Sequence, residues 1–289
     1  MISFFARVTY FEENSKRGDG LYLHRVSSRI RAEEIANYLG IGVRVNPKDG
    51  YENDVCVWIK PKTLKPVKDG DYVDVLDELV FSISWFKERP RVKIIAMTLY
   101  QYEYLKKNLK NEIILIPHHH INFERIQRKK NDVLTCGYIG AYSKNHLEID
   151  KKIKKKLNEI GVDFVPLLDF KWREDAIEYY KKIDIQIIPY HDCRRSDVSI
   201  HPTKIINAAS FGIPTIAIPF YGYKEVEGFY IPLKNIDNLV EEVKRLKENY
   251  VEWSNKVIRK SEEYHISNIS ELYKNLWKKQ SEPLSMNLV

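Results

Sequence analysis

One stretch of the sequence, residues 199–217, combines side chains that could hold an anion with the pattern of a helix and a buried strand. A helix is predicted to begin at Pro202 and to stop at Gly212, and an apolar strand follows. The first turn of such a helix presents unpaired N–H groups and the positive end of the helix dipole, to which Thr203 adds a hydroxyl and Lys204 a cation. These groups together suit a diphosphate, although the pattern alone also fits an ordinary helix–strand unit.

This helix belongs to a longer alternation of short apolar runs with amphipathic segments, which is typical of βα units and a parallel sheet. Strands are predicted in a first series over residues 2–10, 42–45, 54–59, 72–76, 92–98 and 112–116, and in a second series over 133–139, 162–167, 185–189 and 214–218. A polar, basic segment, residues 121–132, is predicted to link the two series. The expected fold class is α/β with two Rossmann-like domains, residues 1–127 and 128–265, followed by a C-terminal helix and tail, residues 266–289, that pack back on the first domain.

The composition argues against several classes of protein. The 289 residues, 44% hydrophobic and 30% charged, suffice for two packed domains, and no apolar run reaches the roughly 18 residues of a membrane span. The first seven residues reach a charge too soon for a secretory signal, and the three cysteines form no CxxC pair, so a cytoplasmic location is expected. The net charge of +7 accompanies no zinc-finger, RRM or basic-zipper pattern, so no nucleic-acid partner is expected.

Several stretches in a fixed order resemble a known family. The signature P-x-K-x-x-E-A-x-A-x-G-x-P-V-I is matched at Pro202, Lys204, Ala208, Ser210, Gly212, Pro214 and Ile216. Residues 20–25, 114–119, 137–144 and 185–190 resemble the accompanying motifs in the same order. The sequence thus resembles the retaining glycosyltransferases with the GT-B fold, of the glycogen-synthase and mannosyltransferase type. The resemblance covers most of the C-terminal half and, more loosely, the N-terminal half. It implies two parallel sheets that face each other across a cleft.

The sequence departs from this family's pattern at two positions. The family has two glutamates eight positions apart around the donor, and here Ser199 and Asn207 stand in their places. In relatives the second glutamate holds ribose hydroxyls, and Asn207 can still accept and donate hydrogen bonds to a ribose. Ser199 is a weaker substitute, for which Asp192 and Asp197 in the same loop could supply an acid.

The resemblance implies a set of residues around a nucleotide-sugar. On the donor side they are Gly140, Tyr142, Lys144, Tyr190, Ser199, Thr203, Lys204 and Asn207, and on the acceptor side they are His24 and Arg25. Lys204 and Lys144 are the candidates to stabilise the departing diphosphate, as basic side chains and a helix N-terminus do in GT-B relatives without a metal. Structural roles stay open, because Lys144 and Arg25 also fit surface positions and Tyr190 fits packing as well as stacking on the base.

Two residues are candidates for the catalytic region. Asp77 ends a predicted strand at the carboxyl edge of the first sheet, where relatives carry a His or Asp, although it also fits the N-cap of the next helix. His118 begins a run of three histidines at the domain junction, of which one is expected to contact donor or acceptor across the cleft. Only His118 and His120 could share a side of an extended chain, so a metal site is not expected there. Hinge packing is the alternative for this triplet.

The expected function is transfer of a sugar from a nucleotide-sugar to an unidentified acceptor, which is a glycan, a lipid or a protein. No cofactor and no metal are expected. Peripheral contact of the basic N-terminal half with the inner face of a membrane is left open. Two other functions are left open as well. One is a catalytically inactive GT-B-like protein that binds a sugar-nucleotide or glycan, which the missing glutamates favour. The other is a nucleotide-sugar epimerase, which would need a buried cluster of acids and histidines.

Overall fold

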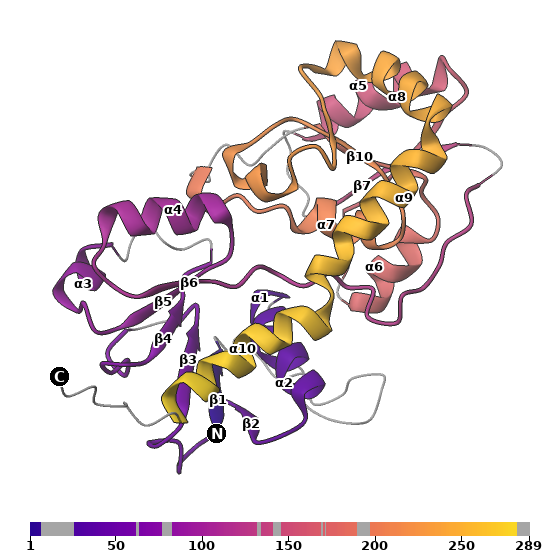
Figure 1. Ribbon diagram of the computed structural model, residues 1–289. Helices are drawn as coiled ribbons and strands as arrows, with labels where there is room; N and C mark the ends of the chain where they lie inside the picture. The colour runs from indigo at the N-terminus through magenta and orange to yellow at the C-terminus, as the bar shows by residue number, and fades with distance from the viewer. Residues whose placement is uncertain are drawn as a thin grey trace. The chain divides into compact units, whose positions relative to one another are not determined.

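The chain divides into two compact units, each built on one parallel sheet (Figure 1). Unit 1 comprises Met1–His118 and Ile266–Val289, and unit 2 comprises His119–His265. The computed structural model describes residues 1–6, 26–61, 64–76, 83–131, 134–140, 146–168, 170, 172–189 and 197–281. All strand pairs in both sheets are parallel, so the predicted α/β class with two parallel sheets is confirmed.

Unit 1 has a six-stranded sheet in the order β2-β1-β3-β4-β5-β6. The strands are β1 (Ile2–Ala6), β2 (Val43–Val45), β3 (Val55–Ile59), β4 (Tyr72–Asp74), β5 (Lys93–Ala96) and β6 (Ile113–Leu115). The helices are α1 (Val26–Ser28), a π-helical turn (Arg29–Glu33), α2 (Glu34–Leu39), α3 (Ile83–Glu88), α4 (Leu99–Asn108) and α10 (Ile266–Ser281). Gly40 follows α2 with a φ of 62°, the left-handed conformation that a helix-ending glycine adopts most readily.

Unit 2 has a five-stranded sheet in the order β11-β10-β9-β7-β8. The strands are β7 (Thr135–Ile139), β8 (Asp163–Leu167), β9 (Ile185–Ile188), β10 (Thr215–Ala217) and β11 (Ile231–Pro232). The α-helices are α5 (His146–Asn158), α6 (Arg173–Tyr180), α7 (Thr203–Ser210), α8 (Leu239–Glu248) and α9 (Tyr250–Ser261). The described residues of the unit also form the 3-10 turns η3 (Asp197–Ser199), η4 (Tyr221–Val226), η5 (Ile236–Asn238) and η6 (Glu262–Tyr264).

The sheet of unit 2 is covered by helices on both faces, as a sheet that is apolar on both sides requires. Helices α5 and α8 lie side by side and pack on one face through a core that includes Cys136 and Tyr138 of β7 (Figure 1). Helices α6 and α7 cover the other face, where Ile139 joins their core. Alternate residues of β7 therefore serve opposite cores, which is the two-residue period of a strand.

Gly137 of β7 is held by close packing against α6. A Cβ at this position would overlap with Tyr179 Oη and lie 2.7 Å from Ile183 Cγ2. The Tyr179 hydroxyl has little freedom to move, since it donates to the carbonyls of Tyr138 (3.0 Å) and Val165 (2.6 Å).

Gly137→Ala is therefore expected to lower the free energy of unfolding by roughly 1–3 kcal/mol. Urea denaturation followed by circular dichroism measures this loss. Tyr179→Phe removes the obstructing oxygen, so the double variant should lose less stability than the sum of the two single variants. Strict additivity of the two losses would show that the hydroxyl is not the obstacle.

A buried network fastens α10 to the rest of unit 1. Arg31, in the π-helical turn, donates to Asp74 Oδ2 at 2.7 Å and to the carbonyls of Ile116 and Pro117 at 2.8 Å each. Tyr273 of α10 donates to the same Asp74 oxygen at 3.4 Å. Burial opposes the charge of Arg31, but the Asp74 carboxylate more than offsets it, so the pKa of Arg31 is raised. Helix α10 is thus joined to strand β4 by a buried network of charged and polar side chains.

None of the helices in the described part of the chain is long and apolar enough to cross a membrane.

Candidate functional site

The sheet of unit 2 has a switch point at β7, which lies between β8 and β9. The chain runs from β7 to β8 on one side and then continues with β9 on the other, and ligands of such sheets bind outside the carboxyl ends of the strands at this point. The segments that leave β7 and β9 begin at Gly140 and Pro189. The N-terminal turn of α7 lies beside β9, because Gln186 of that strand donates to the carbonyl of Lys204.

Helix α7 begins without a side-chain cap at its N-terminus. Pro202 occupies the N-cap position and makes no side-chain hydrogen bond to the first turn. His201 Nδ1 lies 2.7 Å from Thr203 Oγ1, so the hydroxyl of the first helical residue is oriented by the residue before the proline. The positive end of the helix dipole lies at this first turn, and helix N-termini of this kind bind phosphate.

Lys204 and Gly140, which are both predicted donor-side residues, lie next to each other. The Lys204 ammonium lies 5.4 Å from the centre of the Tyr138 ring, and a Cβ on Gly140 would lie 3.2 Å from Lys204 Cε. The same Cβ would overlap with Tyr138 Oη, so a larger residue than glycine would displace this ring. The absence of a side chain at Gly140 therefore lets the lysine stem pass over Tyr138 at the end of β7.

Gln186 is a residue of this region that the sequence analysis did not identify. It is fully buried in β9, donates from Nε2 to the Lys204 carbonyl at 2.8 Å and to Thr215 Oγ1 at 3.3 Å, and accepts from the Tyr180 hydroxyl at 3.1 Å. It therefore sets the position of the first turn of α7 relative to the sheet. The available signal was the single polar side chain in the otherwise apolar strand Ile-Gln-Ile-Ile.

The two residues that replace the family's glutamates have different surroundings. Ser199 ends η3 and is 2% exposed. Asn207 is half-buried on α7, and its Oδ1 accepts a hydrogen bond of 3.1 Å from the backbone N–H of Ile121. The carbonyl side of Asn207 is thus engaged with the chain near the start of unit 2, which leaves its amide nitrogen as the group that could reach a ribose.

A pocket of about 650 Å³ is lined mainly by aromatic residues that come after β10 in the chain, and it was not identified from the sequence. Its lining residues are Pro219, Phe220, Tyr221, Tyr223, Lys224, Glu227 and Tyr230. Gly222 in η4 packs against the carbonyl of Ile200 so closely that a Cβ would overlap with it, which ties η4 to the segment before α7. The ring of Tyr221 is 66% exposed, so this wall of the pocket could stack on a base or a sugar.

The three histidines at the start of unit 2 and the end of unit 1 are all buried: His118 is 6% exposed, and His119 and His120 are each 1% exposed. His119 Nδ1 lies 3.1 Å from the His120 carbonyl, and His120 N–H donates to the carbonyl of Tyr264 at 2.9 Å. The burial and contacts of His119 and His120 therefore support the alternative given above, in which these side chains pack at the hinge. The catalytic role of His118 stays a prediction.

Acidification is expected to destabilise the protein through His120. Burial, aided by His265, His119 and Arg125, lowers the pKa of His120 from about 6.5 to about 3. The His120 imidazole is therefore protonated below about pH 6.5 in the unfolded chain, but only below about pH 3 in the folded chain. This contribution to stability is complete above pH 6.5 and is lost as the pH falls, by about 2 kcal/mol at pH 5.

The pH dependence can be measured by urea denaturation between pH 5 and pH 8 on the wild type and on His120→Gln. The variant should lose about 2 kcal/mol less between pH 7 and pH 5 than the wild type does. Parallel curves for the two proteins would contradict the prediction.

Six predicted site residues lie outside the described part of the chain: His24, Arg25, Asp77, Tyr142, Lys144 and Tyr190. Their roles stay predictions. Burial raises the pKa of the Cys56 thiol to about 12 and that of Cys136 further, so neither is a nucleophile at neutral pH. In the ranges that the structure describes, no group of three His, Cys, Asp or Glu side chains could hold a metal ion.

Comparisons with known proteins show what this chain is similar to. Residues 120–249 match the family model described as Glycosyl transferases group 1. The structure is similar to HepE (Alr3699) of Anabaena in complex with UDP, with a TM-score of 0.60 and 11% identity over 96% of this chain and 99% of that chain. The same protein in complex with UDP-glucose gives a TM-score of 0.57 and 10% identity over the same shares.

A third similar structure is the glycosylation associate protein (Gap123) complex from Streptococcus agalactiae. Its TM-score is 0.55 and its identity 14%, over 85% of this chain and 57% of that chain. No curated protein sequence is significantly similar to the chain. These likenesses confirm the predicted GT-B fold, and the matched family bears out the resemblance seen in the sequence.

Proposed function

We propose that this chain, whose residues 120–249 match the glycosyl transferases of group 1, is a glycosyltransferase that takes a nucleotide-sugar as its donor. The nucleotide-sugar binds to unit 2 outside the carboxyl ends of its strands, and the diphosphate lies at the N-terminus of α7. The structures of HepE with UDP and with UDP-glucose support this class of donor.

The observation that carries the proposal is the position of Lys204. Its ammonium lies over Tyr138 beside Gly140, at the end of β7, and its backbone forms part of the first turn of α7. A diphosphate at this point would meet a cation, the Thr203 hydroxyl and the N–H groups of a helix start. Each of these groups stabilises negative charge, which grows on the diphosphate as the sugar departs.

The remaining chemistry follows from this arrangement. Because the positive groups near α7 belong to the protein, we expect transfer to proceed in EDTA without a divalent metal. Asp77 and His118 are the candidates for the groups that face the reacting hydroxyl, and His24 and Arg25 for the acceptor side. The acceptor is a glycan, a lipid or a protein, and contact with an anionic membrane is a separate proposal that a liposome co-sedimentation assay tests.

A specific observation favours a second candidate, a binding protein without turnover. The family's two glutamates are replaced by Ser199 and Asn207, and the Asn207 carbonyl group already accepts the N–H of Ile121. A site with fewer acceptors for ribose and sugar hydroxyls would hold a nucleotide-sugar while failing to orient its anomeric carbon. Orientation of the reacting atoms is a large part of catalysis, so such a site would bind and not react.

The proposal is tested by measuring the melting temperature of the full chain with UDP-, GDP-, TDP-, CMP- and ADP-sugars, in EDTA and with magnesium. A ligand that binds only the folded protein raises the melting temperature, by about 2.7 kcal/mol of stabilisation at a hundredfold excess over Kd. Release of the nucleoside diphosphate, or of CMP in the case of a CMP-sugar, then reports turnover, and chromatography of the recovered nucleotide-sugar reports epimerisation.

Three outcomes separate the candidates. A metal-independent shift together with nucleotide release supports the glycosyltransferase. A rise in melting temperature supports the binding protein if neither nucleotide release nor epimerisation is seen with a broad mixture of acceptors present. No shift with any of the five donors contradicts both, since each requires a nucleotide-sugar at α7.

A further inference from the structure

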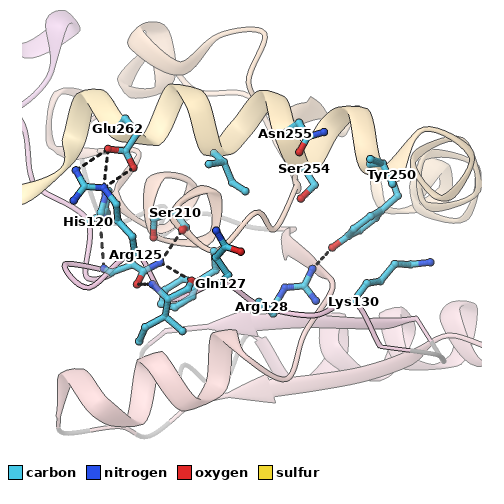
Figure 2. A pocket seen from close by; sticks show the side chains of 15 residues that line it. His120, Arg125, Gln127, Arg128, Lys130, Ser210, Tyr250, Ser254, Asn255 and Glu262 are labelled. Carbon is cyan, nitrogen blue, oxygen red and sulfur yellow. Dashed lines mark hydrogen bonds and ion pairs between the residues drawn. The ribbon is translucent and has the colours of Figure 1, made fainter.

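A second pocket lies in unit 2, away from the N-terminus of α7. It has a volume of about 470 Å³ and is bordered by residues 120–130, by the C-terminal end of α7 and by α9 (Figure 2). We call it the α9 pocket. The candidate donor site lies at the opposite end of the eight-residue helix α7, about 12 Å away along its axis. None of the residues that line the α9 pocket belongs to the proposed donor site.

His120, one of the residues that line this pocket, carries a buried hydrogen-bond donor. Its Nδ1 lies 3.2 Å from the backbone N–H of Asn122, and a backbone N–H can only donate, so Nδ1 is the acceptor. The neutral ring therefore carries its proton on Nε2. That atom is buried and has no hydrogen-bond partner among the described residues. A buried donor without an acceptor destabilises the folded state, so a ligand oxygen at this atom would be stabilising.

Arg128 supplies a second donor of the same kind. Its Nη1 donates to Asp184 Oδ1 at 2.7 Å, and its Nη2 donates to the hydroxyl of Tyr250. Its Nε is buried and finds no acceptor in the part of the chain that the structure describes. The side chain is only 3% exposed, so bulk water does not replace that acceptor.

Among the described residues that line the pocket, positive side chains outnumber negative ones. Arg128 is balanced by Asp184, and Arg125 on the opposite rim is balanced by Glu262 at 3.0 Å (Figure 2). Lys130 lies with its ammonium 5.5 Å from the centre of the Tyr250 ring and is the positive charge in excess. A ligand with one negative group would complete the electrostatics of the pocket.

Polar side chains without charge complete the lining. Gln127, Ser210, Ser254 and Asn255 also line the pocket (Figure 2). Hydroxyl and amide groups of this kind suit the hydroxyls of a polyol. The volume is within the range of small-ligand sites, which begins at about 300 Å³.

We propose that the α9 pocket binds a small phosphate ester of a polyol, with the phosphate toward Arg128 and Lys130 and a hydroxyl oxygen accepting from His120 Nε2. This site is independent of the proposed nucleotide-sugar site. It is expected to remain when donor binding is lost.

The test is isothermal titration of the full chain with glycerol 3-phosphate, with glycerol and with inorganic phosphate. The wild type should bind glycerol 3-phosphate more tightly than inorganic phosphate, and glycerol should not bind. Lys130→Gln should weaken binding roughly three- to fivefold, as loss of an exposed charge does. The matched control is Lys129→Gln. Lys129 is the exposed neighbour of Lys130 but does not line the pocket, so this variant loses the same net charge and should keep the affinity of the wild type.

Two further variants locate the bound molecule. Asn255 is exposed on α9, so Asn255→Trp should fold and block the pocket, and binding should be lost. Lys204→Met removes the cation of the proposed donor site and should leave binding of glycerol 3-phosphate intact. Four results would each overturn the proposal. They are equal weakening of glycerol 3-phosphate binding by Lys129→Gln and Lys130→Gln, loss of binding in Lys204→Met, unchanged binding in Asn255→Trp, and no binding heat with the wild type at millimolar concentrations.

Discussion

Replacing Asp184 with alanine is expected to lower the free energy of unfolding by about 3–5 kcal/mol, because the buried Arg128 then has no counter-charge. Asp184 precedes β9 and is fully buried. Its carboxylate accepts from Arg128 Nη1 at 2.7 Å and, at 2.9 Å each, from the backbone N–H groups of Asn131 and Thr135 and from Asn131 Nδ2. One side chain thus connects the segment before β7 to the start of β9.

The loss has two parts that separate variants distinguish. Asp184→Asn keeps the shape and some of the hydrogen bonds but removes the charge, so it should cost less than Asp184→Ala. Removal of both partners, in Arg128→Met with Asp184→Leu, leaves no buried charge unpaired and should cost less than the sum of the single changes.

The measurement is urea denaturation at pH 7 with circular dichroism. The matched control is Asp163→Ala, an exposed aspartate at the start of β8, which should change stability by no more than about 0.5 kcal/mol. If Asp184→Ala cost no more than this control, the hydrogen bonds around its carboxylate would not be stabilising unit 2.

Most regular elements of the fold could be predicted because each has a local sequence pattern, whereas the two-residue strand β11 (Ile231–Pro232) was not predicted. The helix predicted to run from Pro202 to Gly212 is found as Thr203–Ser210, and Gly212 has a φ of 69° just beyond its end. The alternation of apolar strands with amphipathic helices indicated parallel sheets, and both sheets are parallel. Neighbouring residues set these features, so no long-range contact had to be known.

The buried polar contacts could not be predicted, because the two partners lie far apart in the sequence. Arg31 and Asp74 are 43 positions apart, and Arg128 and Asp184 are 56 positions apart. In a sequence each of these charged residues suggests an exposed position, since charges are rarely buried unless they are paired. The segment 121–132 was predicted to be a linker for the same reason. Its residue Arg128 is instead anchored in unit 2.

The candidate site was predictable only where a motif marked it. Gly140 and Lys204 both belong to stretches that resemble the family, and the structure places them side by side. The aromatic pocket around η4 has no such motif, since in a chain with 19 tyrosines any one of them fits ordinary packing. Gln186 acts through the backbone of Lys204, a contact that no sequence pattern encodes.

Replacing Lys204 with methionine is expected to lower kcat/KM for transfer by a factor of about 10² to 10³, if the chain transfers sugar as proposed, and to weaken donor binding in either case. Methionine keeps an unbranched stem over Tyr138 and beside Gly140, so it removes the charge and preserves the packing at the end of β7.

Because the packing is preserved, the melting temperature without ligand should stay within about 2 °C of the wild type, and the loss should appear only with donor present. Lys204→Arg should retain part of the binding because its charge persists, with a different hydrogen-bond geometry. Lys247→Met, on the exposed last turn of α8, is the control for a change of net charge by one and should bind the donor as the wild type does. Unchanged binding in Lys204→Met would place the diphosphate elsewhere and would remove the observation on which the proposed function depends.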